Sequence, residues 1–401
     1  MTATALQQEE HLPEAIVCKW CGKSFHYLKS HISMGRCENI PESAKGMDVD
    51  EVVKMYTTAF PDEPTISRTA LAKLNEKRAE KHSGEGKVAD ISAHPGYAGT
   101  VEYKTELVAA HELLGVTIKE LGTPRGKPLQ VTVNVNTPYP EFVPEAKKNY
   151  VYGDFDLIKD IFMMLEIGIP GYLWGHAGTG KSSLPTQLCA MLNRPLIRAQ
   201  HTASMEEAHV TGQILARDGS TYFEPGLLAL AMKNGWVYLA DEYDFAFPQI
   251  LGVYQPVLEG EPLIIKEATP DWRRITPHKR FAFIGTGNTN GSGDETGLYQ
   301  GTNIQNAANF SRFGIVSNVK YMSTKAEVNM LAEAGVIREY AEKMVKFANL
   351  VREGYEQHLI SQPIGPRELL LSAKIGMMRG DFSAGIEKSF INKLPSTSAQ
   401  A

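Results

Sequence analysis

The stretch GYLWGHAGTGKSS, residues 171–183, decides the fold class of this chain. Gly175, Gly180, Lys181 and Ser182 meet the pattern G-x-x-x-x-G-K-[ST] in full, after a short apolar stretch and before a helical pattern. The glycines let the backbone curl so that consecutive N–H groups point at phosphate oxygens, and the helix N-terminus adds its positive dipole end. A bare glycine-rich turn is the alternative. Because strand, loop, Lys-Ser and helix follow in order, the pattern predicts a phosphate-binding loop.

The residues of this loop predict how a nucleotide is held. Lys181 would supply a point charge for the β- and γ-phosphates of ATP, and Ser182 would offer its hydroxyl to Mg²⁺. We expect the whole loop to contact the nucleotide, namely Gly175, His176, Ala177, Gly178, Thr179, Gly180, Lys181, Ser182 and Ser183.

A second stretch, WVYLADEYD at 236–244, places acids at the end of an apolar run suited to a buried strand. Burying an unpaired carboxylate is costly or forces it to take a proton. In phosphate-loop NTPases a strand beside the loop ends in an Asp that holds Mg²⁺. We therefore expect Asp241 to hold Mg²⁺ and Glu242 to orient and deprotonate the attacking water. Two solvated acids at a strand end are the alternative.

The adjacent Asp-Glu pair points to the AAA+ class of ATPases rather than to a small GTPase or a kinase. A further buried strand, RFAFIGTGNT at 280–289, ends in a polar residue. Asn288 would then be the sensor that helps to place the attacking water.

Two later arginines fit the same class. Arg312, in NFSRFG, follows a helical pattern and precedes a strand pattern, the position of an arginine finger that reaches a neighbouring subunit's ATP. Arg367 follows Pro366 in the first turn of a predicted helix and fits a second sensor arginine on a helical lid. For each arginine alone a surface salt bridge is the alternative.

Two insertions refine the class. Residues 209–235 indicate a helix interrupted by a short hairpin, and residues 260–280 indicate a second hairpin with Trp272, Arg273 and Arg274 near its turn. Both insertions are typical of the AAA+ branch that contains MoxR-type ATPases and the magnesium and cobalt chelatase motors.

Two stretches carry a more specific resemblance: DEYDFAFPQILGVYQPVLEG at 241–260 and NTNGSGDETGLYQGTNIQNAANFSRFGIVSNVKY at 288–321. They resemble the motor subunits of aerobic cobaltochelatase, the CobS-like family, over about residues 140–325. The resemblance implies a hexameric ring, ATP hydrolysis, and a partner with a von Willebrand A domain that binds a divalent cation. In that family the pair drives metal into a corrin ring held by a third, large subunit. The chain departs from the family at Ser311-Arg312-Phe313, where Asp-Arg-Trp is usual.

A cysteine cluster near the N-terminus predicts a second kind of site. Cys18, Cys21, His31 and Cys37 have the spacing of a tetrahedral Zn²⁺ site, with two thiolates on a tight knuckle and a His/Cys pair on a following short helix. CGKSF, at 21–25, resembles the opening of a C2H2 zinc finger, for which Phe25 and Leu28 would form the small core. His26 is the competing ligand, but it lies too near Cys21 in sequence.

Two binding partners suit this finger. Between Cys18 and Cys37 lie four basic residues and no acid, with Trp20 and Tyr27 interleaved. That composition would suit nucleic acid, and a protein-docking finger fits it equally well. The remaining cysteine, Cys189, lies on the predicted phosphate-loop helix and is expected in the core.

Composition bounds the rest. The chain has 401 residues, 43% hydrophobic and 22% charged, with a net charge of −5, so it is an ordinary globular chain without an all-over basic surface. No apolar run reaches the length of a bilayer span, and the N-terminus lacks a secretory signal pattern. Four cysteines, three of them at metal-ligand spacing, fit a reducing compartment, so we expect a soluble cytoplasmic protein.

The expected architecture is α/β: an AAA+ phosphate-loop core with a parallel sheet, a C-terminal helical lid and a small N-terminal zinc-finger module. Residues 101–121 have helical apolar spacing, and residues 129–137 alternate as a strand does. The expected segments are a finger at 1–45, a mixed region at 46–137 with a linker at 81–87, the core at 138–322, the lid at 323–394 and a disordered tail at 395–401.

Three functions compete at this point. The first is an ATP-driven remodelling motor of the cobaltochelatase/MoxR type that works with a von Willebrand A partner and not with a membrane. The second is a nucleic-acid-directed AAA+ ATPase tethered by its finger. The third is a nucleotide-dependent scaffold with little turnover, against which Glu242 and Arg312 argue.

Overall fold

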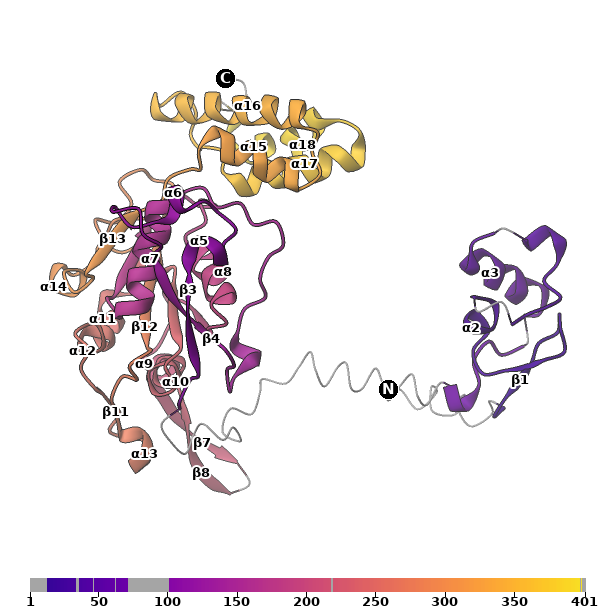
Figure 1. Cartoon of the computed structure of the whole chain (residues 1–401), viewed down its shortest axis with the longest axis horizontal. Helices are drawn as coiled ribbons and strands as arrows, with labels where there is room; N and C mark the ends of the chain where they lie inside the picture. Colours follow the sequence, from indigo (N-terminus) through magenta and orange to yellow (C-terminus); the bar gives the residue numbers. More distant parts are fainter. Residues whose placement is uncertain are drawn as a thin grey trace. The chain divides into compact units, whose positions relative to one another are not determined.

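The chain divides into two compact units, residues 1–94 and 95–401 (Figure 1). A computed structural model describes residues 13–33, 36–45, 47–61, 63–70, 101–217, 219–396 and 398. The predicted linker at 81–87 and most of the predicted tail at 395–401 lie outside the described residues. Of the helices that the structure describes, none is both long and apolar enough to span a bilayer.

A five-stranded parallel sheet forms the centre of the second unit. Its strands lie in the order β13-β5-β12-β9-β6, and every neighbouring pair is parallel. The strands are β5 (Gly171–Trp174), β6 (Leu196–Gln200), β9 (Val237–Asp241), β12 (Ala282–Gly287) and β13 (Ile315–Asn318). Since parallel strands share their carboxyl edge, the loops after β5, β9 and β12 meet at one edge of the sheet. The predicted parallel α/β core is confirmed.

Helices cover the sheet and complete its core. The principal ones are α7 (Phe155–Ile167), α8 (Ser183–Met191) and α10 (Leu227–Asn234). Asp154 caps α7 by accepting from the N–H groups of Asp156 and Leu157 at 3.1 and 3.0 Å. Leu173, Leu239 and Ile284 from three neighbouring strands join buried side chains of α7 and α8 in one apolar cluster. Cys189 is fully buried on α8, as predicted.

Both predicted hairpin insertions are present. The first lies between α9 (Glu207–Thr211) and α10 and pairs β7 (Gly212–Arg217) with β8 (Ser220–Pro225) in antiparallel fashion. The second pairs β10 (Leu263–Ile264) with β11 (Arg274–Ile275), and α13 (Pro270–Arg273) forms its turn. Short helical segments link β9 to this second hairpin: η5 (Tyr243–Phe245), α11 (Pro248–Leu251), η6 (Gly252–Tyr254) and α12 (Gln255–Leu258).

The helix predicted over 101–121 is wrong in part. The structure has a strand, β3 (Thr105–Ala109), followed by two short helices, α5 (Ala110–Leu113) and α6 (Ile118–Leu121). β3 pairs along its length with β4 (Gln130–Asn134), the strand that alternation predicted correctly. The apolar spacing is compatible with either structure, and the pairing with β4 decides for the strand. Gly115, at φ +66°, interrupts the helical continuation between α5 and α6.

The chain after residue 323 forms the predicted helices: α15 (Thr324–Glu333), α16 (Arg338–Glu356), α17 (Pro366–Arg379) and α18 (Phe382–Ser389), with one terminal turn, η7 (Ile391–Lys393). They share an apolar core of their own, drawn orange to yellow in Figure 1. Inside it Arg352 donates to both carboxylate oxygens of Glu327 at 2.8 Å and to the Ile364 carbonyl at 2.9 Å. Both oxygens of the buried Glu327 carboxylate are therefore paired with the Arg352 guanidinium.

The first unit is a small α+β module. It contains β1 (Ile16–Val17), β2 (Ser24–Phe25), α2 (Leu28–Ser33), η1 (Glu42–Ala44) and α3 (Val49–Ala59). β1 and β2 pair as an antiparallel hairpin. Its core contains Phe25 and Leu28, as predicted, together with Val52 and Tyr56 of α3. The packing of this module therefore includes a helix beyond residue 45.

Candidate functional site

The loop between β5 and α8 curls as the glycine pattern predicts. Gly175, Gly178 and Gly180 have φ of 148°, 80° and 103°, values that favour glycine. A Cβ on Gly175 would lie 2.4 Å from the Val319 carbonyl oxygen, so only glycine fits there. The backbone therefore turns from the end of β5 into the N-terminus of α8, where N–H groups are free of helical partners.

Lys181 lies buried in the centre of this loop. Its ammonium donates to the carbonyls of Gly175 and His176 at 2.7 and 2.9 Å and to Asn288 Oδ1 at 3.0 Å. Burial lowers the pKa of Lys181 to about 8, although the carboxylates beginning with Glu242 act in the opposite direction. A cation in such a position is suited to contact phosphate oxygens.

Asp241 closes β9 next to the loop and accepts hydrogen bonds on both carboxylate oxygens. Oδ1 accepts from the hydroxyls of Ser182 and Thr286, each at 2.5 Å, and Oδ2 accepts from Arg198 Nε at 2.6 Å and from its Nη2. Burial would raise the pKa of Asp241, but hydrogen bonds from Ser182, Thr286 and Arg198 outweigh it and lower the pKa. Asp241 is therefore held as a carboxylate.

Glu242 has a left-handed backbone, with φ 55° and ψ 39°, an uncommon conformation for a residue with a side chain. Its Oε2 accepts from Asn288 Nδ2 at 2.8 Å. Burial, followed by the charge of Asp241, raises the pKa of Glu242. A carboxylate with a raised pKa and a fixed orientation suits a general base.

Asp244 proves to be the support of Asn288. It is fully buried, and its Oδ2 accepts from the Asn288 N–H at 2.8 Å and from the N–H and hydroxyl of Thr289 at 2.9 and 3.0 Å. The sequence shows Asp244 only as a third acid after the strand, so its link to the next strand becomes visible in the structure. The ends of β9 and β12 are thereby tied together beside the loop.

Tyr299 contacts the phosphate loop from the segment after β12. Its hydroxyl accepts from the Ala177 N–H at 3.1 Å and lies 2.9 Å from His176 Nδ1. The His176 ring in turn stacks on Tyr321 with a centroid distance of 5.9 Å and meets the edge of Tyr355 of α16. Sequence motifs do not single out these tyrosines, because the G-K-[ST] pattern says nothing of what covers the loop.

Arg367 lies at the loop, as its place in α17 suggests. A Cβ on Gly178 would be 3.4 Å from Arg367 Cβ, and a Cβ on Gly365 would be 3.0 Å from the Ala177 carbonyl oxygen. The N-terminus of α17 therefore packs against the loop. The Arg367 side chain is exposed, free to turn toward a bound phosphate.

Arg312 lies at the opposite edge of the sheet. It follows α14 (Ala307–Phe310) and precedes β13, and the next residue but one, Gly314, donates to the carbonyl of Pro170 just before β5. The phosphate loop follows the other end of β5, about 13 Å away at the usual rise for four residues. The Arg312 guanidinium pairs with Glu259 at 2.8 Å and donates to the Ala308 carbonyl. The structure therefore does not bring Arg312 to the loop of its own chain.

Comparison with known proteins identifies the core. The model of the AAA domain, dynein-related subfamily, matches residues 172–302. The aerobic cobaltochelatase subunit CobS of a Sinorhizobium species is 33% identical over 231 residues, which cover 55% of this chain and 68% of that protein. The chain belongs to the CobS family. Its core is that of an AAA+ ATPase, and ATP hydrolysis is the activity of this class.

More distant similarities cover about 60% of the chain. An uncharacterized protein of Staphylococcus aureus is 23% identical over 257 residues, covering 62% of this chain and 93% of that protein. A putative ATPase from Cytophaga hutchinsonii matches with a TM-score of 0.37 at 14% identity, over 60% of this chain and 81% of that one. A mutant of Thermotoga maritima RuvB matches with a TM-score of 0.39 at 13% identity, over 61% and 72%.

The donor set at Asp241 suits the magnesium ion that ATPases of this class use. The Ser182 hydroxyl and Asp241 Oδ1 lie 2.5 Å apart at the N-terminus of α8, and Thr286 adds a third oxygen beside them. Hard oxygen ligands few in number are what Mg²⁺ takes in nucleotide sites, where phosphates and water complete the shell. The residues of this CobS-family chain therefore fit the metal.

The cysteine cluster lies outside the AAA match and forms a separate candidate metal site in the first unit. The ligand atoms of Cys18, Cys21, His31 and Cys37 all lie within 4.8 Å of one another. Cys18 Sγ is 3.8 Å from Cys37 Sγ, and Cys21 Sγ is 3.3 Å from His31 Nε2. His26 points elsewhere, with Nδ1 3.1 Å from both the Glu14 carbonyl and the Ser67 hydroxyl.

Local structure explains this convergence. The Cys18 N–H donates to the Lys23 carbonyl and the Gly22 N–H to the Cys18 carbonyl, which makes the tight knuckle around Cys21. Burial raises the pKa of Cys37 to about 12 and lowers that of His31. A neutral imidazole is ready to bind a metal, whereas the thiol needs a cation to lose its proton. Three sulfurs and one imidazole nitrogen fit tetrahedral Zn²⁺.

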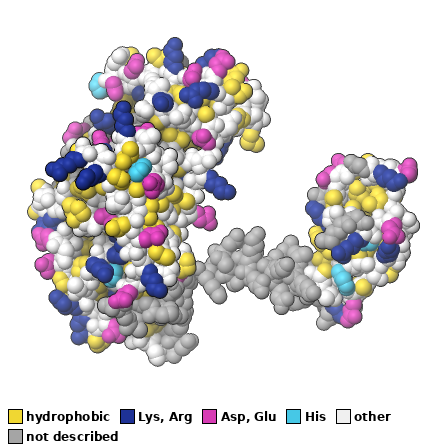
Figure 2. Space-filling view, in the orientation of Figure 1, with side chains coloured by type: hydrophobic (Ala, Val, Ile, Leu, Met, Phe, Trp, Pro, Cys, Tyr) yellow, Lys and Arg dark blue, Asp and Glu magenta, His cyan; other side chains and the backbone are white. Residues whose placement is uncertain are grey.

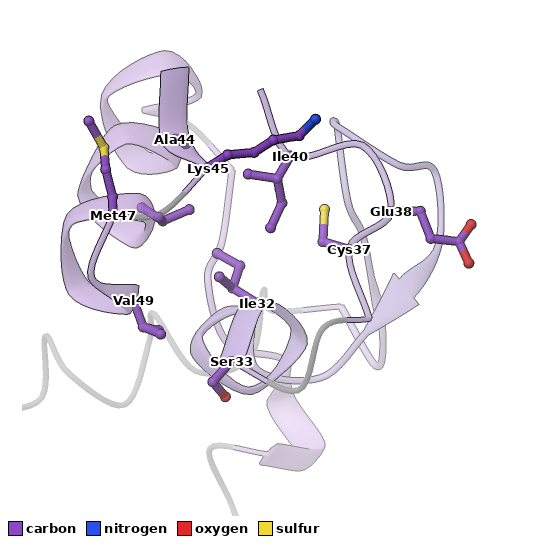
Figure 3. A pocket seen from close by; sticks show the side chains of 10 residues that line it. Ile32, Ser33, Cys37, Glu38, Ile40, Ala44, Lys45, Met47 and Val49 are labelled. Atoms are coloured by element: carbon purple, nitrogen blue, oxygen red, sulfur yellow. The ribbon is translucent and has the colours of Figure 1, made fainter. Parts of the chain in front are cut away.

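A pocket of about 390 Å³ with a mixed polar and apolar lining adjoins the cluster (Figure 3). Ile32 and Ile40 point into it beside Cys37, whereas Glu38 points away.

Two of the basic side chains that could serve nucleic acid are already paired, Lys19 with Glu63 at 2.7 Å and Lys23 with Glu38 at 2.5 Å. Trp20 packs edge-on against Tyr56, at a centroid distance of 4.9 Å.

Proposed function

We propose that this chain is an ATP-hydrolysing motor of the CobS/MoxR type that works as a hexameric ring and remodels a partner complex. The observation that carries the proposal is the placement of Glu242: a half-buried carboxylate oriented by Asn288, beside Lys181 and Asp241, in a chain of the CobS family. A nucleotide-dependent scaffold would have no use for such a base.

In the proposed reaction each group has one task. Backbone N–H groups of the loop and the Lys181 ammonium bind the phosphates, while Ser182 and Asp241 hold Mg²⁺. When bound, the metal neutralises charge on the phosphate oxygens. Glu242 accepts a proton from the attacking water, and Asn288 fixes the orientation of both. Asp244 holds the Asn288 backbone in place. Arg367, on the helical lid, contacts the phosphates as the second sensor arginine.

Assembly supplies the remaining group. Arg312 lies at the amino edge of the sheet, so it can reach only another subunit's nucleotide. We propose that it acts as an arginine finger in trans, the reason for a ring. The family relationship supports a partner with a von Willebrand A domain, and the two inserted hairpins are the features of this branch that support contact with such a partner or its substrate.

Within the first unit, residues 1–45 are proposed as a Zn²⁺ module that recruits protein, with α3 packed against it. The paired lysines and the engaged Trp20 favour protein over nucleic acid. Figure 2 shows basic and acidic side chains interspersed over the visible face of the chain. The mixture favours the same choice, because nucleic-acid binding needs a patch of basic charge. The clustered thiols suit a reducing compartment, so we propose the cytoplasm. The other expected segments stay as proposed, with the core at 138–322 and the lid at 323–394.

Two matched variants test the proposal. Lys181→Ala should lose ATP binding, whereas Glu242→Gln should bind ATP and lose turnover, because one residue holds phosphate and the other handles water. Both are measured by nucleotide-binding fluorescence and steady-state phosphate release. Steady-state ATPase activity in the Glu242→Gln protein would contradict the proposed base.

The same variant identifies what the motor acts on. Affinity purification of ATP-bound Glu242→Gln from extract, with and without nuclease, should retain a protein partner in both cases. Partner capture that nuclease abolishes, together with steep loss of DNA affinity with salt, would instead support the nucleic-acid-directed ATPase. Lys181→Ala serves as the matched control, because it cannot enter the ATP-bound state.

A further inference from the structure

One cation near the phosphate loop has no place in the reaction described above. Arg198 lies on β6, the edge strand of the sheet. It pairs with Leu239 of β9, two residues before Asp241 on that strand. Its side chain is 57% exposed, whereas that of Asp241 is 2% exposed. A guanidinium at the solvent edge thus covers a buried carboxylate.

Arg198 uses up the accepting capacity of Asp241. Its Nε and Nη2 both donate to Oδ2, and the hydroxyls of Ser182 and Thr286 donate to Oδ1. An ionised carboxylate offers about four lone-pair positions, so these four donors satisfy it completely. Charge-assisted hydrogen bonds from a guanidinium are also the strongest of this kind.

The same carboxylate and the Ser182 hydroxyl are the protein oxygens that would hold a divalent cation. A cation that binds Asp241 must therefore displace donors already present, and it meets the positive charge of Arg198 across the shared oxygen atoms. Arg198 can leave with limited loss of packing, since more than half of its side chain is in solvent. The buried hydroxyl of Thr286 has no such freedom.

We propose that Arg198 is a positioning residue that competes with Mg²⁺ for Asp241. It holds the carboxylate aligned while the metal is absent, and it turns away when nucleotide and metal arrive together. The site therefore accepts metal with a nucleotide, whose phosphates supply the missing negative charge, in preference to metal alone. This inference rests on the proposed magnesium site.

Metal binding itself is the test. Mn²⁺ replaces Mg²⁺ and is titrated into full-length protein with saturating ADP, with free Mn²⁺ followed by electron paramagnetic resonance. Arg198→Ala should bind Mn²⁺ about tenfold more tightly than wild type, equivalent to ~1.4 kcal/mol. Arg198→Lys, which keeps the charge but loses the paired donors, should fall between them. Arg274→Ala removes an exposed arginine from β11 and should match wild type.

The outcomes separate cleanly. Unchanged or weaker Mn²⁺ affinity in Arg198→Ala would overturn the inference, and if that variant does not fold, the same reading is taken from Arg198→Lys. A purely structural role would instead lower the melting temperature and weaken ADP binding in EDTA. If the wild-type protein binds ADP but metal has no effect on that binding, the proposed magnesium site is wrong. This result differs from one in which only the inference about Arg198 is wrong.

Discussion

The phosphate-loop site and the cysteine cluster both gather reactive side chains, and they differ in how those side chains are satisfied. At the loop, Lys181 has three acceptors and Asp241 has donors on both oxygens, all from the chain itself. In the cluster the ligand atoms face one another, thiol beside thiol and thiol beside imidazole. Sulfur is a weak hydrogen-bonding partner. We therefore expect the ATPase unit to fold before its ligand binds, and the first unit to depend on a metal.

The largest expected effect is on the first unit. Zinc sites of this kind supply about 10–16 kcal/mol of apparent binding energy, more than the small core around Tyr56 can replace. Cys21→Ser or a strong chelator should remove one Zn²⁺ per chain and unfold this unit, while basal ATPase activity stays nearly unchanged. Elemental analysis and circular dichroism measure this.

His26→Asn is the matched control, because His26 lies outside the cluster and the variant should keep its zinc. A folded first unit in protein shown to lack metal would break the comparison.

The next effect concerns a group that one chain cannot place. Arg312→Ala should bind ATP normally and lose turnover by about 10³–10⁵-fold, the range for arginine fingers in other NTPases. Mixed with Glu242→Gln, it should recover partial activity, since some interfaces then combine intact halves. Phosphate release in the mixture is the measurement.

Glu259→Gln separates this role from a salt bridge. It removes the partner of Arg312 within the chain but keeps the arginine, so turnover should persist. If Glu259→Gln is as inactive as Arg312→Ala, or if exchanging mixtures recover nothing, Arg312 acts within its own chain.

A buried ion pair in the lid tests directly how much stability depends on pairing a buried charge within the chain. Glu327 is fully buried against Arg352, so Arg352→Met should lower the free energy of unfolding by about 3–5 kcal/mol by leaving an unpaired carboxylate. Adding Glu327→Gln should restore much of the loss, as chemical denaturation can show. A single variant as stable as wild type would show that water reaches the pair.

The smallest effect is a pH dependence. The pKa of Lys181 is about 8 against an ordinary 10.5, so between these values the folded protein without nucleotide binds fewer protons than the unfolded chain. Its stability should therefore rise with pH over that window. ATP affinity should fall over the same range, by up to about tenfold per pH unit, because phosphate binding needs the cation.

Fluorescence titration from pH 7 to 10 follows this change. Lys181→Arg keeps its charge throughout and should give a flat profile at lower affinity. A flat profile in wild type would show that Lys181 keeps its proton over the whole range even without nucleotide, so that its pKa is not lowered.

Much of the fold and site could be predicted because their signals are local. The glycine pattern fixes the loop, and apolar runs ending in Asp241 and Asn288 fix two neighbouring strands. Parallel order then brings these residues together at one edge. Cysteine spacing likewise predicts the cluster and excludes His26, because a tight knuckle and one helical turn determine which atoms converge.

What the sequence could not show depends on contacts between distant segments. The strand at 105–109 owes its form to pairing with β4, which helical spacing does not reveal. Arg198 reads as one more polar residue in a strand until the register places it near Asp241. Tyr299 lies in the stretch that resembles CobS, yet no rule of spacing sends its hydroxyl to Ala177.

The segment from Asn288 to Arg312 crosses the sheet from its carboxyl edge to its amino edge. It begins with a side chain on Glu242, lays Tyr299 on the phosphate loop, and ends with an arginine that its own site cannot use. In the proposed ring, such a segment would give the assembly a direction: its first end contacts the nucleotide of its own subunit, and its last end contacts one neighbouring subunit. A structural change caused by ATP hydrolysis would then pass in one direction around the ring.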